Sequence, residues 1–127
     1  MKQDIQNKED IILLVNTFYD HVKIDKVIGH FFIEVVDVHW ETHLPKMYEF
    51  WSQILFQNGN FNGNPMQTHR HVHSLHNMTK EDFEHWLFLF KNTVDSLFEG
   101  NNAEIIKQRA ANIATSLTLK VVYNMGA

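Results

Sequence analysis

The stretch TKEDFEHWLFLFKNTVDSLFEG, residues 79–100, carries a clear helical pattern and is rich in aromatic residues. Thr79 is a suitable N-cap, Asp82 lies three residues later in a weak form of the capping box, and Gly100 is suited to end the helix. Apolar residues recur every three or four positions, which places them on one face of an α-helix. These residues are Phe83, Trp86, Leu87, Phe90, Val94, Leu97 and Phe98. The stretch predicts a helix that buries an aromatic-rich face.

Upstream of this stretch, a first helix is expected after Asn7, another suitable N-cap. Its apolar residues follow helical spacing from Ile11 to Val22, and Gly29 then interrupts the pattern. Residues 30–38 could form a strand or a short helix. Because a lone strand would have no partner elsewhere in this chain, we predict a short helix and a corner.

The apolar stripe from Trp40 to Leu55 predicts a second long helix. Pro45 interrupts this stripe, because proline lacks a backbone donor and its ring clashes one turn back. It either opens the regular helix or kinks it just after His43. Residues 57–63, rich in Asn and Gly, then predict a loop.

The remaining helices are a short one before residue 79 and a long one at the end of the chain. Asn64 followed by Pro65 is typical of a helix start, which places His69 about one turn inside the short helix. A last helix is expected from Asn102 toward Gly126. With about five helices, no convincing hairpin, no repeat and no linker, the chain is predicted to be all-α.

The composition indicates one globular domain, residues 1–127, with 44% hydrophobic and 20% charged residues. The net charge is −4, and Lys and Arg do not cluster, which argues against a nucleic-acid partner. No run of about 18 apolar residues could span a membrane, and the charged N-terminus is unlike a signal peptide. We therefore expect a cytoplasmic protein. The absence of cysteine excludes disulfides, thiolate metal sites and covalently attached haem.

Nine histidines are many for a chain of 127 residues. His39 with His43, and His69 with His73, form two pairs at i, i+4 spacing, which can hold zinc or iron on one helix face. A zinc or di-iron helical bundle is thus the alternative interpretation, although the chain lacks Glu-x-x-His and His-Glu-x-x-His motifs. The other histidines are expected in solvent or, for the last, in a loop: His21, His30, His71, His85 and His76.

A haem site accounts for the histidines and the aromatic residues together. Aromatic residues make up 13% of the chain, and a flat prosthetic group would use their flat surfaces. Haem held without covalent attachment needs a neutral imidazole and an apolar cleft. We predict His69 as the metal ligand, with its other ring nitrogen donating to a backbone carbonyl. Tyr19 and Trp86, on other helices, are positioned by the pattern to face such a group.

Seven motifs follow one another along nearly the whole chain in a specific order and spacing. They are Phe18-Tyr19, Gly29-His30-Phe31-Phe32, Trp40-x-x-His43, Phe50-Trp51, Gly63-Asn64-Pro65-Met66-x-x-His69, Phe83-x-x-Trp86-Leu87-x-Leu89-Phe90 and Thr93-Val94-Asp95-x-x-Phe98-x-Gly100. With these motifs the chain resembles the truncated haemoglobins, and specifically the third group of that family. The absence of a Gly-Gly pair is consistent with the third group.

The resemblance implies a globin-like two-over-two helical sandwich around a b-type haem, with His69 as the proximal iron ligand. The implied haem-contacting residues are Tyr19, Phe32, His43, Met47, Trp51, His69 and Trp86, with Phe31 as the alternative to Phe32 and Phe50 as the alternative to Trp51. Tyr19, His43 and Trp86 would line the distal side. Pro45 departs from the pattern and leaves the orientation of His43 open. Lys46 and Arg70 are the nearest cations for the haem propionates.

The function implied by the resemblance is reversible binding, and transport, of oxygen or another diatomic molecule such as nitric oxide or carbon monoxide. Dioxygenation of nitric oxide or peroxidase-like chemistry would need electrons from a separate reductase, because the chain has neither a flavin nor a nicotinamide motif. Whether the protein is an enzyme is left open by the sequence.

Overall fold

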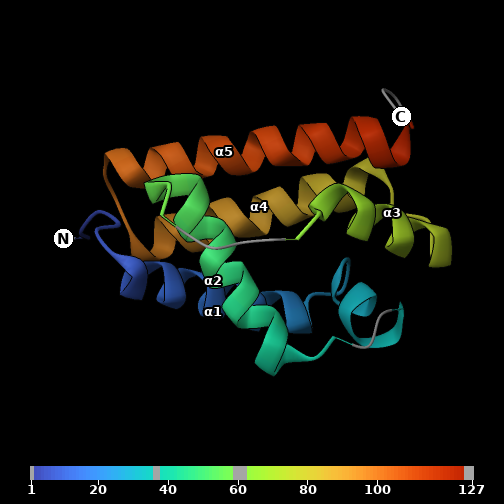
Figure 1. The fold of residues 1–127 in the computed structure, drawn as a ribbon, viewed down its shortest axis with the longest axis horizontal. Helices are drawn as coiled ribbons and strands as arrows, with labels where there is room; N and C mark the ends of the chain where they lie inside the picture. The colour runs from blue at the N-terminus through green and yellow to red at the C-terminus, as the bar shows by residue number, and fades with distance from the viewer. Residues whose placement is uncertain (1, 36–37, 59–62, 125–127) are drawn as a thin grey trace.

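The computed structural model describes residues 2–35, 38–58 and 63–124, and Figure 1 shows its helices. There is no strand in these ranges, so the all-α prediction is confirmed. The elements are α1 (Lys8–Ile24), the π-helical turn η1 (Phe31–Val35), α2 (Trp40–Phe56), α3 (Pro65–Leu75), α4 (Lys80–Leu97), α5 (Asn101–Leu117) and the π-helical turn η2 (Thr118–Val122).

The four long helices form two layers. In Figure 1, α4 and α5 run side by side in opposite directions, α2 crosses in front of them, and α1 lies below. Helix α1 packs on both α2 and α4, and α2 also packs on α5. This is the expected two-over-two arrangement. The short helix α3 packs on η1 and η2, so it flanks the sandwich at the end where the corner lies.

The interior is apolar and lies where α1, α4 and α5 meet. Phe18 is 1% exposed, and Phe90, Leu14 and Ile106 are fully buried within one large cluster. A second, smaller cluster packs the start of α4 against η2. Its buried members are Phe83, Leu117 and Val121. These two clusters hold the layers together by removing apolar surface from water.

Local capping signals place three of the five helix starts. The side chains of Asn7, Asn64 and Thr79 accept hydrogen bonds from backbone N–H groups three residues later. The capping box at Thr79 is complete, because the Asp82 carboxylate also accepts the Thr79 backbone N–H at 2.9 Å. These short-range bonds are satisfied within one turn, which explains why the sequence predicts them.

Some predicted boundaries need correction. Helix α4 ends at Leu97, and Gly100 is instead the N-cap of α5, which begins at Asn101, one residue earlier than expected. Pro45 does not open the regular helix, because α2 begins five residues before it, at Trp40.

The two loops and the C-terminus are described only in part. The short helix expected at 30–38 corresponds to η1, and residues 36–37 lie outside the described residues. Residues 59–62 of the predicted loop at 57–63 also lie outside them, whereas Gln57 has the left-handed backbone expected of this loop (φ 61°). The last helix gives way to the turn η2 after Leu117, and residues 125–127 are not described.

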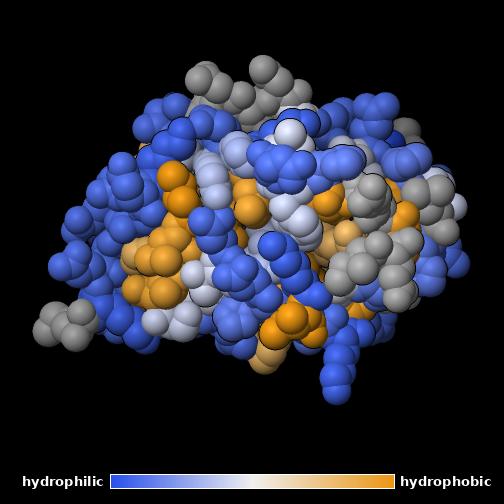
Figure 2. Space-filling view, turned by 90° about the horizontal axis from the view of Figure 1, so that it is seen from below, coloured by the Kyte–Doolittle hydropathy of each residue, from blue (hydrophilic) through white to orange (hydrophobic). Residues whose placement is uncertain are grey.

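The surface mixes hydrophilic residues with small apolar patches, as Figure 2 shows for one face. The most exposed large apolar side chains of the described residues are Ile24 at the end of α1, 81% exposed, and Phe88 on α4, 58% exposed. No helix among the described residues has the length and hydrophobicity needed to cross a bilayer.

Candidate functional site

His69 lies in α3, one turn after Pro65, and its partly buried ring lies 6.1 Å from that of Phe83 on α4. Its Nδ1 is 2.6 Å from the carbonyl oxygen of Pro65. A carbonyl only accepts, so Nδ1 donates and Nε2 keeps a free electron pair. The hydrogen bond to a backbone carbonyl that we predicted for this imidazole is therefore present. An imidazole held in this tautomer is suited to bind a metal through Nε2.

The two central histidines are kept neutral by their surroundings. Burial lowers the pKa of His69, and the hydrogen bond to Pro65 opposes this only in part. Burial also lowers the pKa of His43, and the charges of Lys46 and His69 lower it further. His43 comes from α2 and His69 from α3, and they lie close enough for their charges to interact. Both are predominantly neutral near pH 7.

His43 has a buried nitrogen without a partner. Its Nε2 is inaccessible to water and makes no hydrogen bond within the described residues. Buried polar atoms are nearly always paired in folded proteins, so an orphan of this kind points to a missing ligand or water. The orientation that Pro45 left open is thus inward, toward α1 and α3.

Tyr19 brings α1 to the same place. Its ring centroid lies 5.2 Å from that of His43 and 5.9 Å from that of Phe32, both in edge-to-face contact. The side chain is 6% exposed, and burial raises the pKa of its hydroxyl well above the ordinary value. The hydroxyl therefore remains protonated and can donate a hydrogen bond.

A stack of aromatic rings forms a wall beside Tyr19. Trp51 stacks on Phe90 at 4.6 Å, and Trp86 stacks on Phe90 at 5.6 Å, with interplanar angles of 23° and 15°. Phe18 packs edge-on against Trp86 at 5.9 Å and against Tyr19 at 5.1 Å. These contacts join Trp51 and Trp86, which the sequence predicts on separate helices, to Tyr19 through the buried core.

The alternatives left open at two positions can now be compared. Phe32 contacts Tyr19, whereas Phe31 packs against His30 and His76 at ring distances of 4.2 and 5.5 Å. Phe32 is therefore the corner phenylalanine that lies on the Tyr19 side.

Along α2, the two aromatic alternatives lie next to each other. Trp51 is 3% exposed and belongs to the stack, while Phe50 packs edge-on against it at 5.1 Å. Met47 is partly buried and packs against the same cluster. His43, Met47 and Trp51 thus lie on the face of α2 that is turned toward the interior.

Sequence reasoning missed Trp40 as a site residue. Its ring lies 5.4 Å from Tyr19, 5.6 Å from His43 and 6.0 Å from Phe32. The ammonium group of Lys23 lies 4.3 Å from the centroid of the Trp40 ring. The i, i+3 spacing of Trp40 and His43 was a signal that both share one face of the helix.

Among the remaining histidines, His85 was wrongly expected to be solvated. Its Nε2 lies 2.7 Å from the Asp25 carboxylate, and its side chain is 28% exposed. His30 is also only partly exposed, because it packs against Phe31 and His76. His21 and His71 are exposed as predicted.

The propionate candidates differ in their surroundings. Lys46 is exposed and close enough to His43 for its charge to act on that imidazole. Arg70 is exposed and donates a long hydrogen bond of 3.4 Å to the carbonyl of Lys120 in η2.

The alternative of a zinc or di-iron bundle finds no support in the described residues. No group of three or more His, Cys, Asp or Glu side chains in these ranges could hold a metal ion. Of the two predicted pairs, His39 is exposed, and Nδ1 of His73 accepts a hydrogen bond from the backbone N–H of Met78 at 2.8 Å. Within the described residues, Nε2 of His69 and Nε2 of His43 remain without a hydrogen-bond partner, and both rings lie among aromatic side chains.

These features fit a non-covalent haem. The partly buried imidazole of His69 has an Nε2 suited to ligate an iron, and the aromatic wall offers flat apolar contact. The unpaired Nε2 of His43 is buried close to His69. A b-type haem requires no cysteine, and the chain has none.

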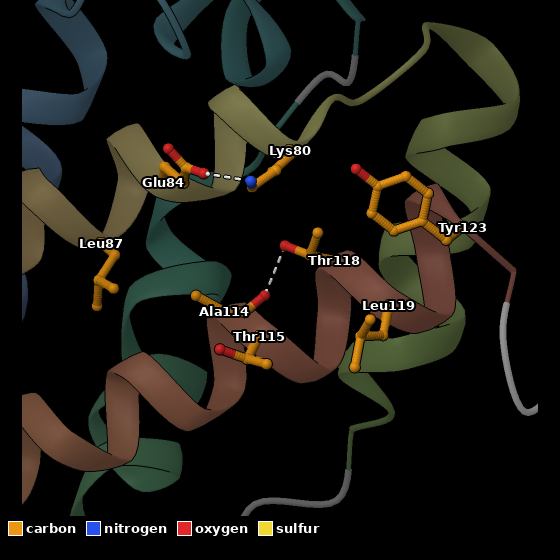
Figure 3. A pocket seen from close by; sticks show the side chains of 8 residues that line it. All are labelled: Lys80, Glu84, Leu87, Ala114, Thr115, Thr118, Leu119 and Tyr123. Atoms are coloured by element: carbon orange, nitrogen blue, oxygen red, sulfur yellow. Dashed lines mark hydrogen bonds and ion pairs between the residues drawn. The ribbon is translucent and has the colours of Figure 1, made fainter.

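A separate pocket of about 370 Å³ lies between the start of α4 and the end of α5 (Figure 3). Among its polar groups, Lys80 forms an ion pair with Glu84 at 3.5 Å, and the hydroxyl of Thr118 donates to the Ala114 carbonyl. None of the predicted site residues lines it. It is therefore not a candidate for the haem.

Comparison with known proteins gives consistent matches. The family model of the bacterial-like globins matches residues 3–119. The chain is 33% identical over 118 residues to a group 3 truncated hemoglobin of Campylobacter jejuni, with 91% of both sequences covered. The crystal structure of a group III truncated hemoglobin from Campylobacter jejuni matches with a TM-score of 0.82 and 31% identity, covering all of both chains.

Proposed function

Because this chain belongs to the group III truncated haemoglobins, within the bacterial-like globins, we propose that it holds a b-type haem and reversibly binds oxygen or another diatomic molecule. The observation that carries this proposal is the partly buried imidazole of His69, whose pKa is lowered by burial and whose Nε2 is free. When bound, the haem would supply an iron that Nε2 of His69 would ligate and that would bind the diatomic molecule.

His69 is proposed as the proximal ligand. Its Nδ1–H donates to the Pro65 carbonyl, which fixes the tautomer and increases the electron density available at Nε2. Because α3 begins at Pro65 and is capped by Asn64, the helical conformation of the backbone that carries the imidazole is stabilised locally.

Tyr19 and Trp86 are proposed as hydrogen-bond donors to the ligand. A bound dioxygen molecule carries partial negative charge, so a donor within hydrogen-bond distance slows its release. The Tyr19 hydroxyl is the first choice, because it is buried and remains protonated. The indole N–H of Trp86 is the second. Each bond in an apolar site contributes roughly 1–2 kcal/mol, or around tenfold in release rate.

The remaining haem-contacting residues are proposed to close the site. His43 borders the distal side and offers a further polar nitrogen, while Phe32, Met47 and Trp51 supply apolar contact. Together they exclude water, which strengthens each hydrogen bond to the ligand.

Consumption of nitric oxide or of peroxide is a further use that this site could serve with electrons from a separate reductase. The polar distal groups Tyr19 and His43 are compatible with it. Nitric oxide consumption measured with and without an added reductant separates turnover from simple ligand binding.

The test is a visible spectrum of protein produced with ample haem, in the oxidised, reduced and carbon-monoxide-bound forms. We expect a Soret band in the wild type and its loss in His69→Ala. His71→Ala, an exposed histidine two residues along the same helix, is the matched control and keeps the band. A colourless wild type, or a His69→Ala variant with an unchanged spectrum, contradicts the proposal.

A further inference from the structure

We propose that Trp40, held in place by Lys23, is a positioning residue that fixes the rings of His43 and Tyr19 and thereby limits how fast ligands reach the site. This inference rests on the proposed function, because it concerns access to the same haem site. It adds Lys23 and Trp40, which are not among the haem-contacting residues that the resemblance implies, although Trp40 belongs to the motif Trp40-x-x-His43.

Trp40 completes a triangle of rings contributed by two helices. The centroid of Trp40 lies 5.4 Å from that of Tyr19 on α1 and 5.6 Å from that of His43 on α2, and Tyr19 lies 5.2 Å from His43. All three contacts are edge-to-face, the favoured geometry for such rings. Because each ring contacts the other two, rotation of any one of them would alter two of these contacts.

Lys23 holds the triangle from α1. Its ammonium group lies 4.3 Å from the Trp40 ring centroid, well within the distance of a cation–π contact. Lys23 follows Tyr19 by one helical turn, so both lie on the same side of α1. Trp40 and His43 are likewise one turn apart on α2. Two side chains of one helix thus meet two of the other.

His43 depends on these neighbours for its orientation. Its Nε2 is buried and has no hydrogen-bond partner within the described residues, so no polar contact fixes that end of the ring. Packing against Tyr19 and Trp40 is what holds it. Removing the Trp40 ring therefore frees His43 to rotate and opens space beside Tyr19.

A purely structural role is the competing explanation. Helices α1 and α2 are already joined elsewhere, by the ion pair of Lys8 with Glu49 and by the hydrogen bond from the Tyr48 hydroxyl to Asn16 at 2.6 Å. If Trp40 only added to these links, its removal would lower thermal stability and leave ligand association unchanged. Ligand kinetics and stability must therefore be measured on the same variants.

The experiment measures carbon monoxide association with the reduced haem protein by flash photolysis. Trp40→Leu removes the ring, and we expect association to rise about tenfold. Lys23→Met keeps the apolar stem and removes the charge, and we expect a rise of about two- to fivefold. Trp40→Phe retains a ring and is expected to stay within about twofold of the wild type. Lys26→Met, at an exposed position three residues after Lys23, is the control and should not change the rate.

The outcomes separate the two proposals. A wild type that takes up no haem removes the proposed function and this inference with it. A haem-binding wild type whose rate is unchanged in Trp40→Leu and Lys23→Met overturns this inference alone. If Trp40→Leu does not fold, Lys23→Met decides the matter, because it alters only a partly exposed side chain.

Discussion

Tyr19 has a ring that packs in the core and a hydroxyl that can donate a hydrogen bond. Replacing Tyr19 by phenylalanine tests the two roles separately, because it removes only the hydroxyl. The ring contacts Phe18, Phe32, Trp40 and His43, so its shape is part of the core. Substitution by phenylalanine preserves these contacts and removes only the hydrogen-bond donor.

We expect Tyr19→Phe to release oxygen from the reduced protein around tenfold faster, because the ligand loses one buried hydrogen bond. Stopped-flow release rates measure this. Tyr48→Phe is the matched control, since the Tyr48 hydroxyl donates to Asn16 on the outside of the site and its loss should leave release unchanged. Release rates within twofold of the wild type would remove Tyr19 from the donor role.

At the scale of elements, helix α4 carries both Phe83 and Trp86 and starts at a complete capping box. The box satisfies two backbone donors reciprocally, through the Thr79 hydroxyl and the Asp82 carboxylate. The position of Trp86, and with it the aromatic wall, therefore depends in part on the capping box at the start of α4.

We expect Thr79→Ala to reduce the free energy of unfolding by about 1 kcal/mol, because the first turn of α4 loses its cap. Urea unfolding followed by circular dichroism measures the change. Thr115→Ala, at an exposed position within α5, is the control and should have little effect. An equal change in both variants would show that the cap contributes nothing specific.

Asp25, directly after α1, links the turn that follows this helix to α4. Its carboxylate accepts hydrogen bonds from the backbone N–H groups of Val27 and Ile28 and from Nε2 of His85 on α4. Burial alone would raise the pKa of Asp25, but these hydrogen bonds and the charge of His85 together lower it below its ordinary value of 3.8. Folding therefore favours the ionised carboxylate.

We expect Asp25→Asn to be less stable than the wild type at neutral pH. A lowered carboxyl pKa contributes stability above the unfolded-state value of 3.8 and loses it as the pH falls through the folded-state value. The stability difference between the two proteins should thus narrow only below about pH 4. Thermal unfolding from pH 7 to pH 3 tests this, and equal stability at pH 7 would contradict it. Asp20→Asn, at an exposed site on α1, is the control.

At the scale of the whole molecule, the N-terminal segment caps the last helix. The Asp4 carboxylate accepts the backbone N–H groups of Asn102 and Ala103, both at 2.9 Å, at the start of α5. Gly100, the N-cap of α5, has no side chain to do this. It also has φ +145°, and a Cβ there would lie 2.5 Å from Cγ of Asp4. The absence of a side chain at Gly100 thus leaves the space in which the Asp4 carboxylate caps α5.

We expect Asp4→Ala to reduce the free energy of unfolding by about 1–2 kcal/mol, as for the loss of a helix cap. Gly100→Ala should cost about 1–3 kcal/mol because of the left-handed backbone and the clash with Asp4. The double variant should be less destabilised than the sum, since removing the carboxylate relieves the contacts with Cγ and Oδ2 of Asp4, although Cβ of residue 4 stays 2.7 Å away. Urea unfolding of the four proteins measures the coupling, and strict additivity would contradict it.

The sequence by itself determined the all-α class, the main helices and the pattern of a globin. These features depend on interactions within one helical turn, such as the caps at Asn7, Asn64 and Thr79 and the apolar spacing of residues 83–98, so they can be read along the chain. The hydrogen bond from His69 to Pro65 is of the same local kind, because its partners are four residues apart.

Only the tertiary structure decided which residues meet across helices. Lys23 reaches Trp40, His85 reaches Asp25 across 60 positions, and Asp4 caps a helix 98 positions away. Each pairing follows from how the layers cross and how tightly the core packs, and no local signal encodes it. For the same reason, an expectation of solvation failed at His85, whose partner lies on another helix.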